Sequence, residues 1–316
     1  MPINRGERHT PIFLNSTYQY QVQHFCLPRV NDSQNRAVTC QLESDSSSAN
    51  MSVKLEGNIF VTGSNRGIGL ELVKQLAGMT GGDTHIYACC REPEGSRAQA
   101  LREVTTQYSG KISIIKLDVS DEDSVSAAVQ AVSKQIGDGG LNLLINNAAI
   151  AKPTFPGTLA ATSKKHMMEV YETNVGGPFL TAKMFLPLLQ KAAGGNSAEM
   201  HKGDTMSCRR AAIINISTYI SSMEKCSENF HLAQMYAYRT SKAALNMLTC
   251  CLAEDLKTHN ILVTAIHPGW VRTELGGSKA PLTSQESVLS MLSVMSSLSN
   301  KDSGMLLDWQ GTTIPW

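Results

Sequence analysis

The sequence predicts an α/β fold built on a doubly wound, mainly parallel sheet with helices on both faces. Short runs that are apolar almost throughout, such as NIFVTG at 58–63 and ILVTAIHP at 261–268, alternate with longer segments of helical periodicity. Strands of this kind are typical of parallel sheets, because helices cover both faces of such a sheet. Ligands bind at the carboxyl ends of these strands, so functional residues are expected there.

The individual elements are recognised by their apolar periods and by their ends. A helix is expected to begin after Asp121, because an aspartate ahead of an acidic first turn is a good N-cap. The polar, glycine-containing stretch 192–210 is expected to be a surface loop or insertion. The predicted strands are 58–63, 85–90, 112–119, 141–148, 211–217 and 261–268. The helices predicted between the first four strands are 69–78, 96–108 and 121–136. A long helical pattern precedes each of the last two strands.

Bulk composition excludes several classes of protein. The 316 residues carry 28 Lys and Arg against 27 Asp and Glu, a formal net charge of +1. Such a chain is not expected to bind nucleic acid or an anionic membrane as its main partner, and its apolar runs are too short to span a membrane. The eight cysteines form no CxxC pair and no zinc spacing. We therefore expect reduced thiols, no metal site and a cytoplasmic protein.

Residues 1–50 are expected to be a disordered extension ahead of a single folded domain at 51–316. They are rich in Ser, Asn, Gln and Thr and show no sustained period. They also lack the basic start and the apolar stretch of a secretory signal.

A glycine-rich turn lies between the first strand and the first helix. In VTGSNRGIG the glycines are Gly63, Gly67 and Gly69, with Asn65, Arg66 and Ile68 between them. Glycines let the backbone approach a pyrophosphate, and the free N–H groups and dipole of the following helix stabilise its negative charge. A purely structural turn would have the same composition, but this position favours nucleotide binding.

The end of the second strand bears on the choice between NADP and NAD. An enzyme that uses NAD usually carries an acidic residue here, whereas this strand ends in Cys90 followed by Arg91. Together with Arg66, Arg91 suits the 2′-phosphate of NADP(H), because arginine–phosphate contacts are strong charge-assisted hydrogen bonds. The alternative is that both arginines are solvated and that Glu92 binds the ribose of NAD.

A tyrosine and a lysine four residues apart lie in MYAYRTSK. On a helix such residues share a face, which selects Tyr238 with Lys242, since Tyr236 has Thr240 at that spacing. A nearby ammonium group lowers the pKa of a phenol and makes Tyr238 a candidate general acid. An ordinary surface pair would show the same spacing, but the glycine turn upstream favours a catalytic one.

These motifs together resemble the short-chain dehydrogenase/reductase family over about residues 56–316. The matching pieces, in family order, are TGSNRGIG, LDVSD, NNAA, TNVGG, INIST, YRTSK and HPGWVRTEL. Several of them look like the C-factor/sniffer-type carbonyl reductase branch. The resemblance implies a Rossmann-type sheet of seven strands in a single domain.

The resemblance also implies roles for further residues. Thr218 stands where the family has a serine hydroxyl that holds the substrate oxygen, and Asn174 matches the asparagine that kinks its helix and organises a water leading to Lys242. The resemblance further implies that Tyr238 and Lys242 contact the cofactor, Lys242 at its ribose. The remaining implied cofactor contacts are Asp118 and Val119 beside the adenine, Asn147 and Ala148 along the cofactor, and Val271 and Thr273 near the nicotinamide.

Three functions are compatible with these residues. The first is NADPH-dependent reduction of small carbonyl compounds. In the family, helices of two copies can pair into a homodimer, whereas the enlarged loop before Tyr238 can block such pairing. The second is a nucleotide-binding regulatory or scaffold protein without turnover, suggested by Thr218 and by Ala149, where the family usually has glycine. The third is an alcohol or steroid dehydrogenase that uses NAD.

Overall fold

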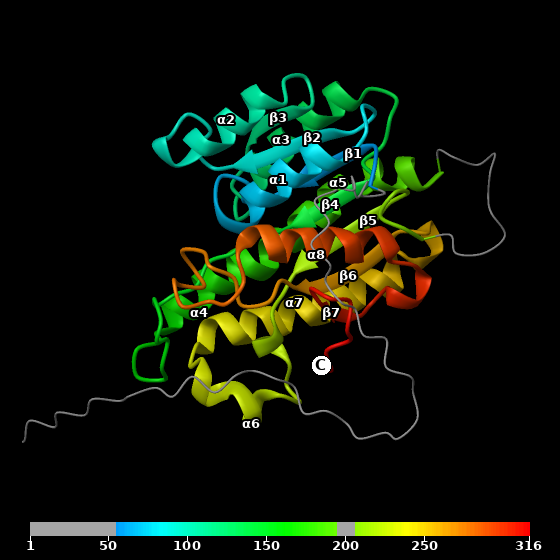
Figure 1. Ribbon diagram of the computed structural model, residues 1–316. Coiled ribbons are helices and arrows are strands. Elements are labelled where there is room, and N and C mark those ends of the chain that lie inside the picture. Colours follow the sequence, from blue (N-terminus) through cyan, green and yellow to red (C-terminus); the bar gives the residue numbers. More distant parts are fainter. Residues whose placement is uncertain (1–54, 195–205) are drawn as a thin grey trace, which may run out of the picture. The chain divides into compact units, whose positions relative to one another are not determined.

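The computed structural model describes residues 55–194 and 206–316. The predicted extension 1–50 and part of the predicted loop 192–210 lie outside these residues. The described residues form one sheet of seven parallel strands in the order β3-β2-β1-β4-β5-β6-β7 (Figure 1), which confirms the predicted fold class. The strands are β1 Asn58–Val61, β2 His85–Cys90, β3 Ile112–Lys116, β4 Leu143–Asn146, β5 Ala212–Ile216, β6 Leu262–His267 and β7 Leu306–Asp308.

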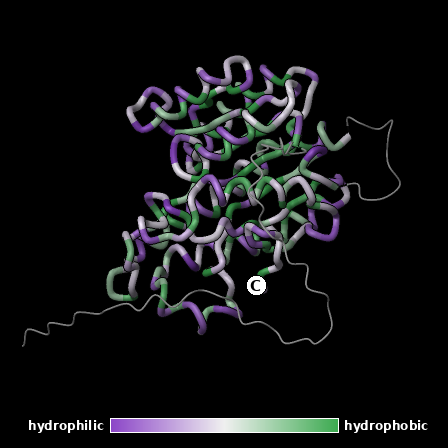
Figure 2. Tube along the Cα trace, in the orientation of Figure 1, coloured by the Kyte–Doolittle hydropathy of each residue, from purple (hydrophilic) through white to green (hydrophobic). Residues whose placement is uncertain are grey.

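Helices cover the two faces of the sheet, because alternate residues of each strand point to opposite sides. On one face Ile59 and Val61 pack with α1 (Gly67–Met79), α2 (Gln99–Gln107) and α8 (Ser284–Ser297). On the other face Phe60 packs with α3 (Glu122–Ile136), α5 (Gly177–Gly194) and α7 (Tyr236–Asp255). The hydrophobic stretches in Figure 2 accordingly run through the interior.

The ends of two helices show how local sequence sets the elements. The Asp121 side chain accepts hydrogen bonds from the backbone N–H groups of Asp123 and Ser124, as expected of an N-cap for α3. The predicted helix at 96–108 is divided into the 3₁₀ turn η1 (Ser96–Ala98) and α2. The other short pieces are α4 Lys164–Tyr171, the π-turn η2 Glu172–Gly176, η3 Tyr219–Ser221, α6 Cys226–Asn229, η4 Phe230–Leu232, η5 Lys257–His259 and η6 Asn300–Asp302.

The strand order places the ligand crevice. The chain moves outward from β1 through β2 to β3 and then returns to lay β4 on the other side of β1. The carboxyl ends of β1 and β4 therefore form the switch point at which doubly wound sheets bind their ligands. Within 55–194 and 206–316, no helix is long and apolar enough to cross a membrane.

Candidate active site

The residues singled out in the sequence follow the carboxyl ends of six adjacent strands. Gly63, Asn65 and Arg66 lie between β1 and α1, and Gly67, Ile68 and Gly69 form the first turn of α1. Arg91 follows β2, Asp118 and Val119 follow β3, Asn147 and Ala148 follow β4, Thr218 follows β5, and Val271 and Thr273 follow β6. Tyr238 and Lys242 lie in the first two turns of α7, and Asn174 lies in the π-turn before α5.

Tyr238 and Lys242 share one face of α7. The Lys242 Nζ atom lies 6.0 Å from the centroid of the Tyr238 ring. The lysine side chain is buried, and its Nζ donates a 2.7 Å hydrogen bond to the backbone oxygen of Ile216 at the end of β5. Tyr236 instead packs edge-on against Phe230, with 5.5 Å between ring centroids. The helix therefore separates one tyrosine beside the lysine from one that packs against a neighbouring segment.

Burial dominates the protonation of this pair. Desolvation raises the pKa of Tyr238 to about 12 and lowers the pKa of Lys242 to about 7. The sequence had suggested a lowered pKa for the Tyr238 phenol, because the sequence shows the neighbouring ammonium group of Lys242. It does not show that burial removes water from around both groups. Tyr238 thus holds its proton firmly at neutral pH, while Lys242 exchanges its proton easily.

The two hydroxyl residues at the end of β5 have different surroundings. The Ser217 hydroxyl donates a 2.6 Å hydrogen bond to Asn246 Oδ1 on α7 and lies 3.4 Å from the Ser221 hydroxyl. Thr218 precedes η3, and its side chain makes no capping hydrogen bond there. Among the described residues the Thr218 hydroxyl has no hydrogen-bond partner. Of the two, Thr218 is therefore the hydroxyl that can donate to a ligand.

The Asn174 side chain connects three segments at the site by hydrogen bonds. Its side chain is fully buried, and its Oδ1 accepts from the Ile150 N–H while its Nδ2 donates to the Ile150 oxygen, both at 2.9 Å. The same Nδ2 donates to the Ser241 hydroxyl on α7 at 3.1 Å. The side chain thus joins the segment after β4, the π-turn and the helix that carries Tyr238 and Lys242.

The glycine turn is shaped by close backbone contacts. A Cβ atom at Gly69 would lie 2.1 Å from the Gly63 oxygen, and one at Gly63, whose φ is +67°, would lie 2.9 Å from the Ala148 Cα. Asn147 Nδ2 donates to the Thr62 and Gly63 oxygens at 2.9 and 3.1 Å. Only glycine can adopt this turn without strain at Gly63 or collision at Gly69.

The start of α1 suits an anion. The helix has no acidic residue in its first turn, and its N-cap, Arg66, makes no side-chain hydrogen bond to the exposed N–H groups. Unsatisfied N–H groups at a helix N-terminus favour a phosphate. The residues present therefore fit the pyrophosphate of a dinucleotide.

A cavity of about 710 Å³ lies beyond the ends of β2 and β3. Arg91, Lys116 and Asp118 line it together with Glu92, Asp121, Ser124 and Ala127. Asp118 is held in place because its Oδ1 accepts from the N–H and the hydroxyl of Ser120, at 3.0 and 2.7 Å. Val119 is buried, and a Cβ built at Gly177 would lie 2.7 Å from it. The cavity is large enough for a nucleoside, and its lining sets the basic side chains of Arg91 and Lys116 beside the carboxylates of Glu92, Asp118 and Asp121.

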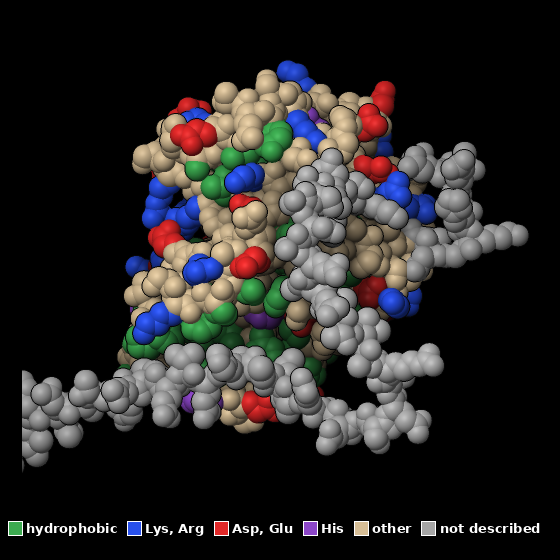
Figure 3. Space-filling model, viewed as in Figure 1, with side chains coloured by type: hydrophobic (Ala, Val, Ile, Leu, Met, Phe, Trp, Pro, Cys, Tyr) green, Lys and Arg blue, Asp and Glu red, His purple; other side chains and the backbone are tan. Residues whose placement is uncertain are grey.

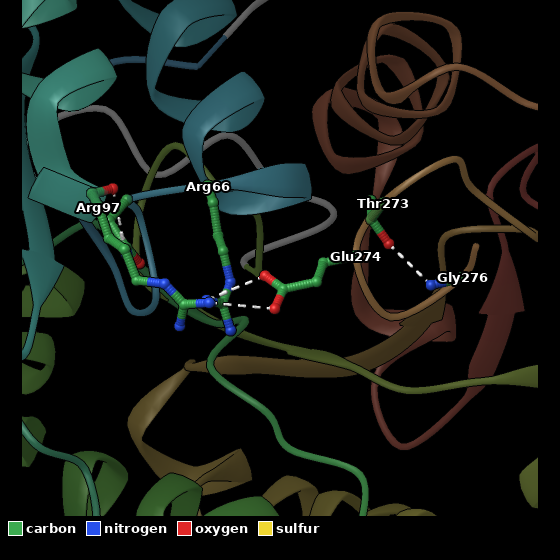
Figure 4. A network of polar contacts seen from close by, with 6 residues as sticks. Arg66, Arg97, Thr273, Glu274 and Gly276 are labelled. Atoms are coloured by element: carbon green, nitrogen blue, oxygen red, sulfur yellow. Dashed lines mark hydrogen bonds and ion pairs between the residues drawn. The ribbon is translucent and has the colours of Figure 1, made fainter. Parts of the chain in front are cut away.

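A contact absent from the sequence analysis crosses the crevice (Figure 4). Glu274 follows β6, and its two carboxylate oxygens lie 3.1 Å from Arg66 of the glycine turn and 3.1 Å from Arg97 of η1. The guanidinium of Arg66 is thus paired with a carboxylate, where the sequence suggested either a phosphate partner or a solvated side chain. No local pattern could reveal this pair, because Glu274 is far from both arginines in the chain. All three side chains are at least 47% exposed, so each pair contributes about 0–1 kcal/mol.

The fold and this arrangement define a nucleotide-dependent oxidoreductase of the Rossmann type. The chain belongs to the short-chain dehydrogenase family, since the family model described as short chain dehydrogenase matches residues 57–282. The protein is therefore an oxidoreductase of this family, as its motifs predict.

Three relatives show where it lies within the family. The solved structure of the NADPH-bound carbonyl reductase from chicken fatty liver is 41% identical, with a TM-score of 0.78 over 84% of this chain and 97% of that chain. Carbonyl reductase Sniffer of D. melanogaster is 35% identical, with a TM-score of 0.75 over 83% of this chain and 100% of that chain. C-signal of Myxococcus xanthus is 30% identical over 188 residues, which are 60% of this chain and 100% of that protein. These similarities confirm the predicted branch.

Proposed function

We propose that this protein is an NADPH-dependent carbonyl reductase with Tyr238 as the proton donor. The observation that carries the proposal is the pairing of Tyr238 with the buried Lys242 on one face of α7, together with the unpartnered hydroxyl of Thr218 after β5. Burial raises the pKa of Tyr238 to about 12, so the phenol is protonated at neutral pH, and a positioned phenol beside an amino group can give its proton to a substrate oxygen on which charge develops. The carbonyl reductases among the similar solved structures support the same assignment.

Each side chain has a defined part in the proposed reaction. NADPH, when bound, supplies hydride to the carbonyl carbon. The Tyr238 hydroxyl gives its proton to the carbonyl oxygen, and the Thr218 hydroxyl donates a hydrogen bond to that oxygen as charge develops there. The phenolate that Tyr238 becomes is stabilised by the ammonium form of Lys242, which also binds the cofactor ribose. Asn174 keeps α7 in register with the segment after β4.

A panel of aldehydes, ketones and quinones tests this function by following NADPH oxidation. Turnover of several members supports reduction of carbonyl compounds. Tight binding of NADPH with no turnover of any member would favour the nucleotide-binding regulatory protein instead. Efficient oxidation of alcohols with NAD, without a preference for NADPH, would favour the alcohol or steroid dehydrogenase.

We expect Thr218→Val to lower kcat by about 10²–10³-fold, because one hydrogen-bond donor to the developing oxyanion is lost. Valine keeps the shape of threonine, so the affinity for NADPH should change less than twofold. Thr218→Ser keeps the hydroxyl and should retain most of the activity. A Thr218→Val enzyme as active as the unaltered one would show that Thr218 does not take the part of the family serine.

The preference for NADPH over NADH should depend on Arg91, which lines the cavity beyond β2 and β3. Loss of one charge-assisted hydrogen bond to a phosphate corresponds to about 1.5–3 kcal/mol. We therefore expect Arg91→Ala to lower kcat/KM for NADPH by about 10–100-fold and to leave kcat/KM for NADH nearly unchanged. Arg209→Ala is a matched control, because Arg209 pairs with Glu56 at the opposite ends of the strands. An equal loss with both cofactors would exclude a phosphate contact.

We also propose a cytoplasmic homodimer. Cys89, Cys90 and Cys208 are buried free thiols, as expected in a reducing compartment. Phe179 on α5 and Met247 on α7, which are 46% and 62% exposed, give neighbouring helices an apolar outer surface that a second copy could cover. A monomeric mass in solution would contradict the homodimer. Fractionation of the protein with another compartment would contradict the cytoplasmic location.

A further inference from the structure

A buried arginine follows the proposed proton donor directly. Arg239 is only 6% exposed, and its guanidinium makes four hydrogen bonds to one segment of the chain. Nη1 donates to the Ile220 oxygen at 3.0 Å and to Asn229 Oδ1 at 2.7 Å. Nη2 donates to the Asn229 oxygen at 2.8 Å, and Nε donates to the Ala233 oxygen at 2.7 Å. One side chain of α7 therefore holds the beginning, middle and end of this segment.

The segment, residues 219–233, is here called the lip. It consists of η3, α6 and η4, and it leads from Thr218 to the start of the helix that carries Tyr238. Figure 1 shows α6 at the lower edge, beyond α7 and away from the sheet. Phe230 of the lip lies 5.3 Å from the Arg239 guanidinium carbon, and the Glu224 N–H donates to the Trp316 oxygen at 2.9 Å. The lip is thus a short segment built on helical turns, which hydrogen bonds also join to α7 and to Trp316.

A second segment contacts the start of α7, two residues before the proposed proton donor. The Tyr236 N–H donates to the Gly157 oxygen at 3.1 Å, which brings the loop 151–162 against the start of α7. The loop exposes Phe155 (63%) and Leu159 (71%), and the lip exposes Met223 (68%) and Leu232 (48%). Figure 3 shows apolar side chains exposed on one face of the molecule, between α8 and α6. Because the lip begins directly after Thr218 and the loop contacts the start of α7, both segments are expected to border the access to Tyr238, and their exposed apolar side chains suit apolar carbonyl compounds.

The partners of Arg239 indicate a geometric role. Among the described residues, no carboxylate lies within ion-pair distance of its guanidinium. Burying a charge is unfavourable unless hydrogen bonds satisfy it, and here the acceptors are three backbone oxygens and one amide. The planar fork of arginine can reach all of them at once, whereas the point charge of a lysine cannot.

We propose that Arg239 is a specificity-determining positioning residue, which fastens the lip 219–233 to the catalytic helix and so sets the width of the access to Tyr238. The inference rests on the proposed carbonyl reductase function. Arg239 acts through the lip and does not contact the reacting atoms. It is expected to decide which carbonyl compounds reach Tyr238 rather than how fast the proton moves.

The first test is kinetic and compares Arg239→Lys and Arg239→Met with the unaltered protein. For a small aldehyde, kcat should stay within about threefold. For a bulky apolar ketone, KM should change by fivefold or more, so that the ratio of kcat/KM between the two substrates shifts. The Kd for NADPH should stay within twofold. Lys225→Met is the matched control, because Lys225 lies on the lip and, within 55–194 and 206–316, forms ion pairs with just its neighbours Glu224 and Glu228 on the surface. Equal losses of kcat for both substrates would overturn the proposal.

The second test needs no turnover and separates this inference from the proposed function. Backbone hydrogen exchange in 219–233 should be at least tenfold faster in Arg239→Lys, while exchange in β1 and α1 stays unchanged. Unchanged exchange in the lip would overturn the positioning role even if the enzyme reduces carbonyl compounds. Faster exchange in the lip together with no carbonyl turnover would support the positioning role of Arg239 and contradict the proposed carbonyl reductase function. Asn229→Ala, which removes one acceptor, replaces Arg239→Met if that variant does not fold.

Discussion

Tyr238→Phe is expected to lower kcat for carbonyl reduction by about 10²–10⁴-fold, the usual contribution of a positioned general acid. The substitution removes only the hydroxyl, whose pKa is raised to about 12 by burial, so it removes the proton without leaving a large cavity. Steady-state rates at saturating NADPH and substrate measure the effect. The Kd for NADPH, measured by fluorescence or calorimetry, should change by less than about threefold.

Tyr236→Phe is the matched control, since Tyr236 lies two residues away in the same helix and packs against Phe230. Its kcat should remain within about twofold of the unaltered enzyme. A fully active Tyr238→Phe enzyme would refute the proposed mechanism. Equal losses in both variants would indicate damage to α7 and not loss of a proton donor.

Lys242→Met is expected to change how the stability of the protein depends on pH. The pKa of Lys242 is about 7 in the folded protein, against 10.5 for a free lysine side chain. Between these pH values the unfolded chain binds more protons than the folded one, so the free energy of unfolding rises as the pH increases from about 7 to 10. The rise assigned to this one group is at most about 5 kcal/mol. Methionine does not titrate, so the variant should lose this rise.

Urea unfolding of both proteins without added cofactor, at intervals from pH 6.5 to 10, measures the difference. At the lowest pH the variant should have its largest gain in the free energy of unfolding over the unaltered protein, because the unaltered protein must bury Lys242 in its charged form there. The advantage should shrink as the pH increases. Lys257→Met, at an exposed lysine beyond α7, controls for the loss of one surface charge. Parallel profiles for Lys242→Met and the unaltered protein would contradict the desolvated state of Lys242.

Local spacing was enough to find much of the candidate site. Gly63, Gly67 and Gly69 could be recognised because a strand, a turn and a helix follow one another within a few residues. Tyr238 and Lys242 could be paired because a helix brings residues four apart onto one face. The choice of Thr218 over Ser217 rested on the family resemblance, and the engagement of Ser217 with Asn246 on α7 gives it a physical reason.

Contacts between distant parts of the chain could not be read in this way. Glu274 meets Arg66 and Arg97 only because the loop after β6 folds back over the glycine turn. Arg239 looked like an ordinary residue between Tyr238 and Lys242, and its four acceptors became visible only when the lip was seen to wrap around it. The seventh strand, Leu306–Asp308, was expected from the resemblance alone, because three residues are too few to show a period.

By itself, the sequence determined the class of fold and the family, and it indicated the residues proposed for the cofactor turn and for the Tyr238–Lys242 pair. Those properties depend on periods and spacings within single elements, which the chain order preserves. The tertiary structure alone decided the protonation of the pair, because the direction of a pKa shift depends on how much water remains around each group. It also decided which arginines meet a carboxylate and which one holds the lip, since such partners are brought together only when the sheet and its loops have packed.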